Sequence, residues 1–202
     1  MPRRSCSAAI ADSGITSTRP RSRLRARIAL AVAGLLLVLP AAARGPDFAF
    51  PTEIAGFARG PRTEFEARAP GLGYGVVYTH GRWKADIFVY DLGVAAIPDG
   101  PASPAVGGQV EQAGREIGTM VERGVYRASQ DRGAVRLDGA AGAALACHAF
   151  GIDHPALGPT ESLLCVTGLR GKFVKFRLSS PAERTPPRAE AERFMTGWLG
   201  QQ

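Results

Sequence analysis

Two cysteines, Cys147 and Cys165, are the residues whose type and spacing indicate chemistry most clearly. They fall in two expected strands, residues 143–151 and 162–169, which flank a loop centred near Ala156. If these strands form an antiparallel hairpin about that centre, the cysteines lie opposite each other on one face. Opposite residues in such a pair have Cα atoms ~4.5–5.5 Å apart, and disulfides span ~4.4–6.8 Å. We therefore expect a Cys147–Cys165 disulfide, with two free buried thiols as the alternative.

The three histidines do not predict a metal site. Cys147 and His148 are neighbours on one strand, so their side chains point to opposite faces of the sheet and do not share an ion. His154 lies in a loop, and His80 lies at the tip of an expected hairpin. The sequence contains no G-x-S-x-G, no Walker motif and no H-E-x-x-H. We expect no metal, no cofactor and no catalytic residue, while a hydrolase built from scattered polar residues stays open as an alternative.

Aromatic residues form two groups in the expected strands. Tyr78 and Trp83 share one face of a hairpin, and we expect them to pack in the core. Phe88, Tyr90 and Asp91 are less clearly core residues. They form the candidate ligand groove of this sequence.

The first 43 residues have the layout of a secretory signal peptide. A basic stretch at 19–27 precedes an uncharged apolar run at 28–39, and small residues follow at 40–43. The apolar run is shorter than the roughly 20 residues of a membrane-spanning helix. We expect cleavage near Ala43 and a periplasmic or secreted mature protein. An uncleaved membrane anchor and a cytosolic protein are the alternatives.

Most of the positive charge lies in this leader. The chain has 25 Lys and Arg against 18 Asp and Glu, a net charge of +7. Residues 1–43 hold seven Arg and one Asp, so residues 44–202 keep 18 basic and 17 acidic residues and a net charge of +1. This balance does not favour nucleic acid as a partner. We expect an unknown protein or envelope component as the partner of one domain, 44–202, and membrane contact only through an uncleaved leader.

Two hairpins are expected in the part after the leader. Each is a pair of strands around a two-residue turn: 74–79 and 83–91 around His80-Gly81, and 162–169 and 172–179 around Arg170-Gly171. Pairing about the first turn places Tyr78 opposite Trp83. Pairing about the second places Cys165 on the same face as Phe176.

Two helices complete the expected fold. The first begins at Ser103-Pro104, has apolar residues at helical spacing from Val106 to Val121, and ends at Gly124. The second covers 186–199, with Thr185 as its cap. The order of strands, helix, strands and helix predicts an α+β fold. We expect an antiparallel sheet of about six to seven strands, covered by two main helices on its two faces.

Three segments carry a resemblance to a known group of proteins. They are residues 50–57 (FPTEIAGF), 85–93 (ADIFVYDLG) and 97–100 (IPDG). They resemble uncharacterised exported bacterial proteins, and the order of elements is similar to that of the PsbP/Mog1/DcrB-like α/β/α sandwich. This resemblance implies a fold that accessory and interaction proteins use, and it implies no activity.

We therefore expect a non-catalytic binding or accessory module, and each alternative has its own structural signature. An interaction module should show a contiguous exposed apolar patch. A small-molecule carrier should show an apolar pocket between sheet and helix. A hydrolase should show His80 or His154 in a cleft beside a carboxylate or hydroxyl.

Overall fold

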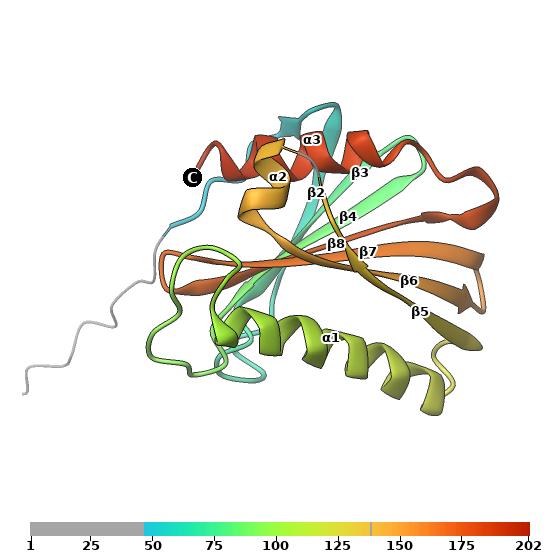
Figure 1. The fold of residues 1–202 in the computed structure, drawn as a ribbon, viewed down its shortest axis with the longest axis horizontal. Coiled ribbons are helices and arrows are strands. Elements are labelled where there is room, and N and C mark those ends of the chain that lie inside the picture. Colours follow the sequence, from blue (N-terminus) through green and yellow to red (C-terminus); the bar gives the residue numbers. More distant parts are fainter. Residues whose placement is uncertain (1–46, 138) are drawn as a thin grey trace, which may run out of the picture. The chain divides into compact units, whose positions relative to one another are not determined.

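An eight-stranded antiparallel sheet forms the centre of the protein (Figure 1). The computed structural model describes residues 47–137 and 139–202, so the expected leader, residues 1–43, lies outside the described residues. The spatial order of the strands is β1-β2-β3-β4-β8-β7-β6-β5. Their bounds are β1 (Glu53–Ile54), β2 (Phe57–Glu64), β3 (Tyr74–His80), β4 (Trp83–Tyr90), β5 (Ala128–Val135), β6 (Ala146–His154), β7 (Gly158–Leu169) and β8 (Lys172–Pro181).

Helices lie on both faces of the sheet, as expected. Helix α1 (Pro104–Glu122) covers one face, and α2 (Gly139–Ala144) and α3 (Arg188–Leu199) lie on the other (Figure 1). A short 3-10 turn, η1 (Ala182–Arg184), precedes α3. In the part of the chain that the structure describes, no helix is both long and apolar enough to cross a membrane.

Helix α1 begins and ends where the sequence predicts. The Ser103 hydroxyl accepts a hydrogen bond from the Val106 amide at 3.2 Å, and Pro104 occupies the first turn. Gly124 follows the helix with a left-handed φ of 70°. The predicted cap of the last helix is wrong, because Pro187 precedes α3 and the Thr185 hydroxyl instead donates to the Pro181 and Ala182 carbonyls.

The expected number of strands, six to seven, is too low. A strand predicted at 63–67 instead occupies 57–64, and the two-residue β1 pairs with it. Two short strands predicted at 125–129 and 135–137 form one bulged strand, β5. Short α2 was also missed, because its sequence, GAAGAA, offers no apolar periodicity.

One hairpin has the predicted register and the other does not. About Arg170-Gly171, Cys165 pairs with Phe176 as expected. In the first hairpin the turn is Gly81-Arg82, so His80 pairs with Trp83, and Tyr78 pairs with Ala85. Gly81 takes a φ of 54° at the first turn position, which suits glycine. Because the error is two residues, every side chain keeps its predicted face.

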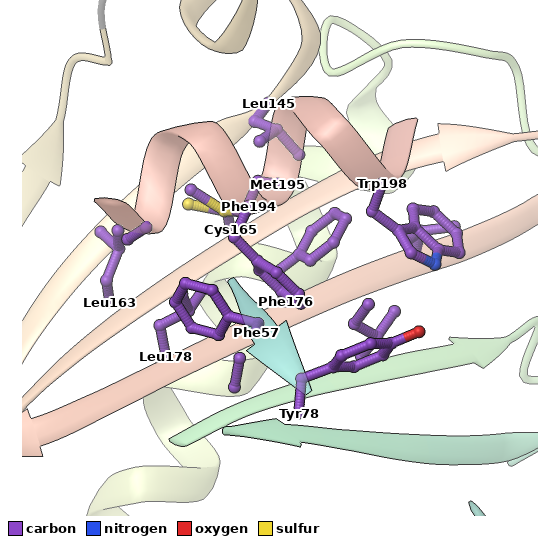
Figure 2. Packing of buried hydrophobic residues seen from close by; sticks show 14 of the residues in the cluster. Phe57, Tyr78, Leu145, Leu163, Cys165, Phe176, Leu178, Phe194, Met195 and Trp198 are labelled. Atoms are coloured by element: carbon purple, nitrogen blue, oxygen red, sulfur yellow. The ribbon is translucent and has the colours of Figure 1, made fainter. Parts of the chain in front are cut away.

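The larger core lies between the sheet and α3 (Figure 2). Phe194 of α3 packs on Phe57 and Tyr78, with ring centroids 4.4 and 5.2 Å apart. The Tyr78 hydroxyl donates to the Pro51 carbonyl at 2.8 Å, and burial raises the pKa of Tyr78 to about 12. Trp198 lies edge-on to Phe176 in the same core. The aromatic group predicted for the core is therefore in it.

A smaller core lies beneath α1. Val106, Ala113 and Ile117 face the sheet from the helix, and Leu164 and Val166 meet them from β7. Helix α1 packs chiefly on β5, β6 and β7. It also reaches over β8 to β4, where the Tyr90 hydroxyl donates to Gln109 of the helix.

Candidate functional site

The expected disulfide is present. Cys147 of β6 and Cys165 of β7 pair directly across the sheet, and a disulfide joins them with Cα atoms 4.1 Å apart. Both cysteines are buried in the core under α2 and α3. The bond closes a loop with a sequence separation of 18 residues and ties β6 to β7.

The histidines are placed by local hydrogen bonds. His80 Nδ1 donates to the Gly56 carbonyl at 2.9 Å, and the ring packs on Phe57. His154 Nδ1 accepts from the Ala156 and Leu157 amides. For a hydrolase we expected one of these two histidines to lie beside a carboxylate or hydroxyl. Among the residues that the structure describes, neither of them bonds a carboxylate.

A third histidine does meet a carboxylate. His148 Nε2 bonds Asp131, and the ring stacks on Phe150 at 4.8 Å between centroids. The hydrogen bond from His148, and a second from the Gly133 amide, hold the pKa of Asp131 below its usual value. Over 47–137 and 139–202, no group of three or more His, Cys, Asp or Glu side chains is arranged to hold a metal ion.

Two adjoining loops at one end of the sheet present apolar side chains to solvent. We call them the loop end: residues 65–73, between β2 and β3, and residues 91–94, after β4. Leu72, Leu92 and Val94 are each between 41% and 44% exposed. The Leu92 amide donates to the Gly71 carbonyl at 2.8 Å, so the two loops are joined by backbone. The exposed apolar side chains therefore belong to two loops that backbone hydrogen bonds join.

Glu66 fixes the first of these loops. Its carboxylate accepts hydrogen bonds from the Gly71 amide at 3.0 Å and the Gly73 amide at 2.9 Å. These two bonds lower the pKa of Glu66. Gly73 has a φ of 55°, and a Cβ there would lie 1.9 Å from the Val89 carbonyl oxygen, so only glycine fits.

Asp91 fixes the second loop. One carboxylate oxygen accepts from the Gly93 amide at 2.8 Å, and the other pairs with Lys172. The hydrogen bond from Lys172, with the one from Gly93, lowers the pKa of Asp91. Leu92 between them has a left-handed φ of 53°. For an L-residue this backbone costs roughly 1–2 kcal/mol, so the surroundings must hold it there.

The structure separates the three residues of the predicted groove. Asp91 belongs to the loop end, whereas Phe88 and Tyr90 lie on the sheet face that carries α1. Tyr90 is buried, its hydroxyl donates to Gln109 of α1 at 2.9 Å, and burial raises its pKa. Phe88 is half-buried beside Lys175 of β8.

Neither the apolar residues of the loop end nor the lysine beside Phe88 was predicted from the sequence. Leu72 and Leu92 lie next to Gly71, Gly73 and Gly93, and such glycine-flanked leucines are a signal for a displayed apolar side chain. No comparable signal exists for Lys175. Its burial depends on where α1 crosses the sheet, which the local pattern does not contain.

Comparisons with known proteins give a weak structural likeness. No protein-family model matches the chain, and no curated protein matches it. A solution structure of cyanobacterial PsbP (CyanoP) from Synechocystis sp. PCC 6803 matches 77% of this chain and 96% of that chain. The TM-score is 0.42 and the sequence identity 16%. The resemblance expected from the sequence is thus confirmed as a weak likeness of fold, and function must be argued from this chain's own residues.

Proposed function

We propose that the protein is an exported, non-catalytic accessory module that binds another protein of the cell envelope through the loop end. The observation that carries this proposal is the exposure of Leu72, Leu92 and Val94 on two loops that are hydrogen-bonded to each other. Exposed apolar side chains gathered in one region of a domain are typical of an interaction site.

Energetics support this role for the loop end. Burying an apolar side chain of this size stabilises a fold by about 1.5–3 kcal/mol, and the loop end forgoes much of that gain. Leu92 also keeps an unfavourable left-handed backbone. The Glu66 and Asp91 carboxylates hold both loops in this form. The loops are thus preorganised, which reduces the entropy lost when a partner binds.

The charges of the loop end balance. Glu66 is matched by Arg68 in the same loop, and Asp91 is paired with Lys172. With no excess of positive charge, the loop end has no electrostatic attraction to a negatively charged lipid surface. A protein with an apolar patch of its own suits it better.

Export is part of the proposal, with a periplasmic or secreted mature chain. The layout of residues 1–43 supports it, and so does the disulfide, since disulfides persist in oxidising compartments. The nearly neutral charge of residues 44–202 fits a protein partner in that compartment better than nucleic acid.

Site-specific photo-crosslinking in the native host tests the proposal. A benzoyl-phenylalanine at Leu72 should give one dominant protein adduct. The same probe at Leu157 is the matched control, because Leu157 is 67% exposed in the β6–β7 turn, outside the loop end. Adding Leu92→Ser to the Leu72 probe should weaken the adduct. No adduct from position 72, or equal adducts from 72 and 157, would contradict the proposal.

A further inference from the structure

A cavity of about 120 Å³ lies at the flank of α1. Its walls come from α1, β4, β7 and β8 and from the chain that follows α1, and they include Phe88, Met120, Tyr126, Leu164, Lys175 and Arg177. One water needs roughly 10–15 Å³ by the same measure, so the space exceeds that of a single bridging water. It is large enough for one aromatic ring or a short acyl chain.

Lys175 places an ammonium group in this largely apolar space. It lies on β8, opposite Phe88 of β4, and its side chain is only 19% exposed. The ammonium stands 5.1 Å from the centre of the Phe88 ring and 5.3 Å from that of Tyr90. Burial lowers the pKa of Lys175, because the charged form loses its hydration.

The protein gives this ammonium few partners. The Glu116 carboxylate is 3.9 Å away on a side chain that is 52% exposed. Lys175 Nζ makes no hydrogen bond to any residue in 47–137 or 139–202. The ammonium is mostly but not fully buried, and an anion in the cavity would supply hydrogen bonds in place of the water that it has lost.

The second cation of the cavity is already engaged. Arg177 donates to the Tyr126 hydroxyl at 2.9 Å and to the Ser162 hydroxyl at 3.4 Å. With Glu116 as the one carboxylate among the lining residues, Lys175 and Arg177 leave a net charge of +1. A single negative charge balances the site.

We propose that this cavity binds a small amphipathic monocarboxylate, with the carboxylate on the Lys175 ammonium and the apolar part against Phe88 and Met120. The apolar walls disfavour inorganic anions, which offer nothing to bury there. A monoanion matches the net charge of +1 of the lining residues better than a phosphate does. The cavity shares no lining residue with the loop end, although Phe65 of the loop end packs near Phe88, with ring centroids 6.3 Å apart. Each proposal has its own test, so either can fail without the other.

Isothermal calorimetry on the full mature domain tests this site with phenylacetate as the probe and phenylacetamide as its neutral counterpart. Phenylacetate should bind, and the amide should bind at least roughly tenfold more weakly, because it lacks the charge-assisted bond. Lys175→Met keeps the length and apolar stem of the side chain, and it should lose phenylacetate binding to a similar extent. Lys84→Met is the matched control, since Lys84 lies on β4 outside the lining residues and pairs with Asp86.

Four results would overturn the inference. They are no binding of phenylacetate to the unmodified protein, equal binding of the amide, unchanged binding by Lys175→Met, and equal losses in Lys175→Met and Lys84→Met. Should Lys175→Met fail to fold, the comparison of acid with amide on the unmodified protein still decides. Phe88→Ala gives a second check. Removing this wall should weaken the binding of phenylacetate, whereas Lys84→Met should leave that binding unchanged.

Discussion

Single residues decide much of the chemistry of this domain. The two cysteines were placed by arithmetic on their positions in a hairpin, and the structure joins them. Lys175 shows the opposite case, because its surroundings come from α1 and β4, which are distant in sequence. Residues whose neighbours lie on the adjacent strand are therefore predictable, and residues whose neighbours depend on the crossing of a helix are not.

The disulfide gives a prediction at this scale. The double change Cys147→Ala and Cys165→Ala should lower the free energy of unfolding by about 2–4 kcal/mol, because the bond restricts the unfolded chain. Urea denaturation of the purified domain measures it. Chemical reduction of the unmodified protein is the control and should lower the midpoint by a similar amount. Identical midpoints for the oxidised and reduced protein would contradict a structural role for the bond.

Among the elements, hairpins and the first helix were predicted best. Strong local signals exist for them: a glycine turn between apolar strands, and a Ser-Pro start before apolar residues at helical spacing. The missed elements have weak signals. Strand β5 is charged and bulged at the edge of the sheet, and α2 is a run of glycine and alanine. Such elements form because the rest of the sheet and core give them a place.

The loops of the loop end give a prediction for acid. The pKa of Glu66 is lower in the folded protein than its ordinary value of 4.5. The ionised Glu66 carboxylate therefore stabilises the folded loop fully above pH 4.5, and this stabilisation is lost as the pH falls through the lowered pKa of the folded state. Amide hydrogen exchange at Gly71 and Gly73, corrected for intrinsic rates, should show this loss of protection.

A matched pair of variants separates the effect from general acid unfolding. Glu66→Gln should expose the Gly71 and Gly73 amides to faster exchange at neutral pH. Glu64→Gln should not, since the Glu64 carboxylate forms an exposed pair with Arg62 and does not bond these amides. Equal protection in both variants would show that the Glu66 carboxylate does not hold the loop.

At the scale of the whole molecule, the proposed export links the charge of the domain, the disulfide and the proposed partner. Removal of residues 1–43 leaves a domain of net charge +1, and export would place its cysteine pair in an oxidising compartment. The protein partner proposed for the loop end belongs to that compartment. The candidate site itself was only partly predictable. Phe88, Tyr90 and Asp91 were singled out as one groove, and the structure divides them between the α1 flank and the loop end.

The intact mass of the protein purified from its native host, after thiol alkylation without reductant, tests export most directly. We predict a chain that begins near Arg44, with Cys147 and Cys165 unalkylated and lacking their two thiol hydrogens. A chain that retains residues 1–43, recovered from the cytosol with both cysteines alkylated, would contradict the account.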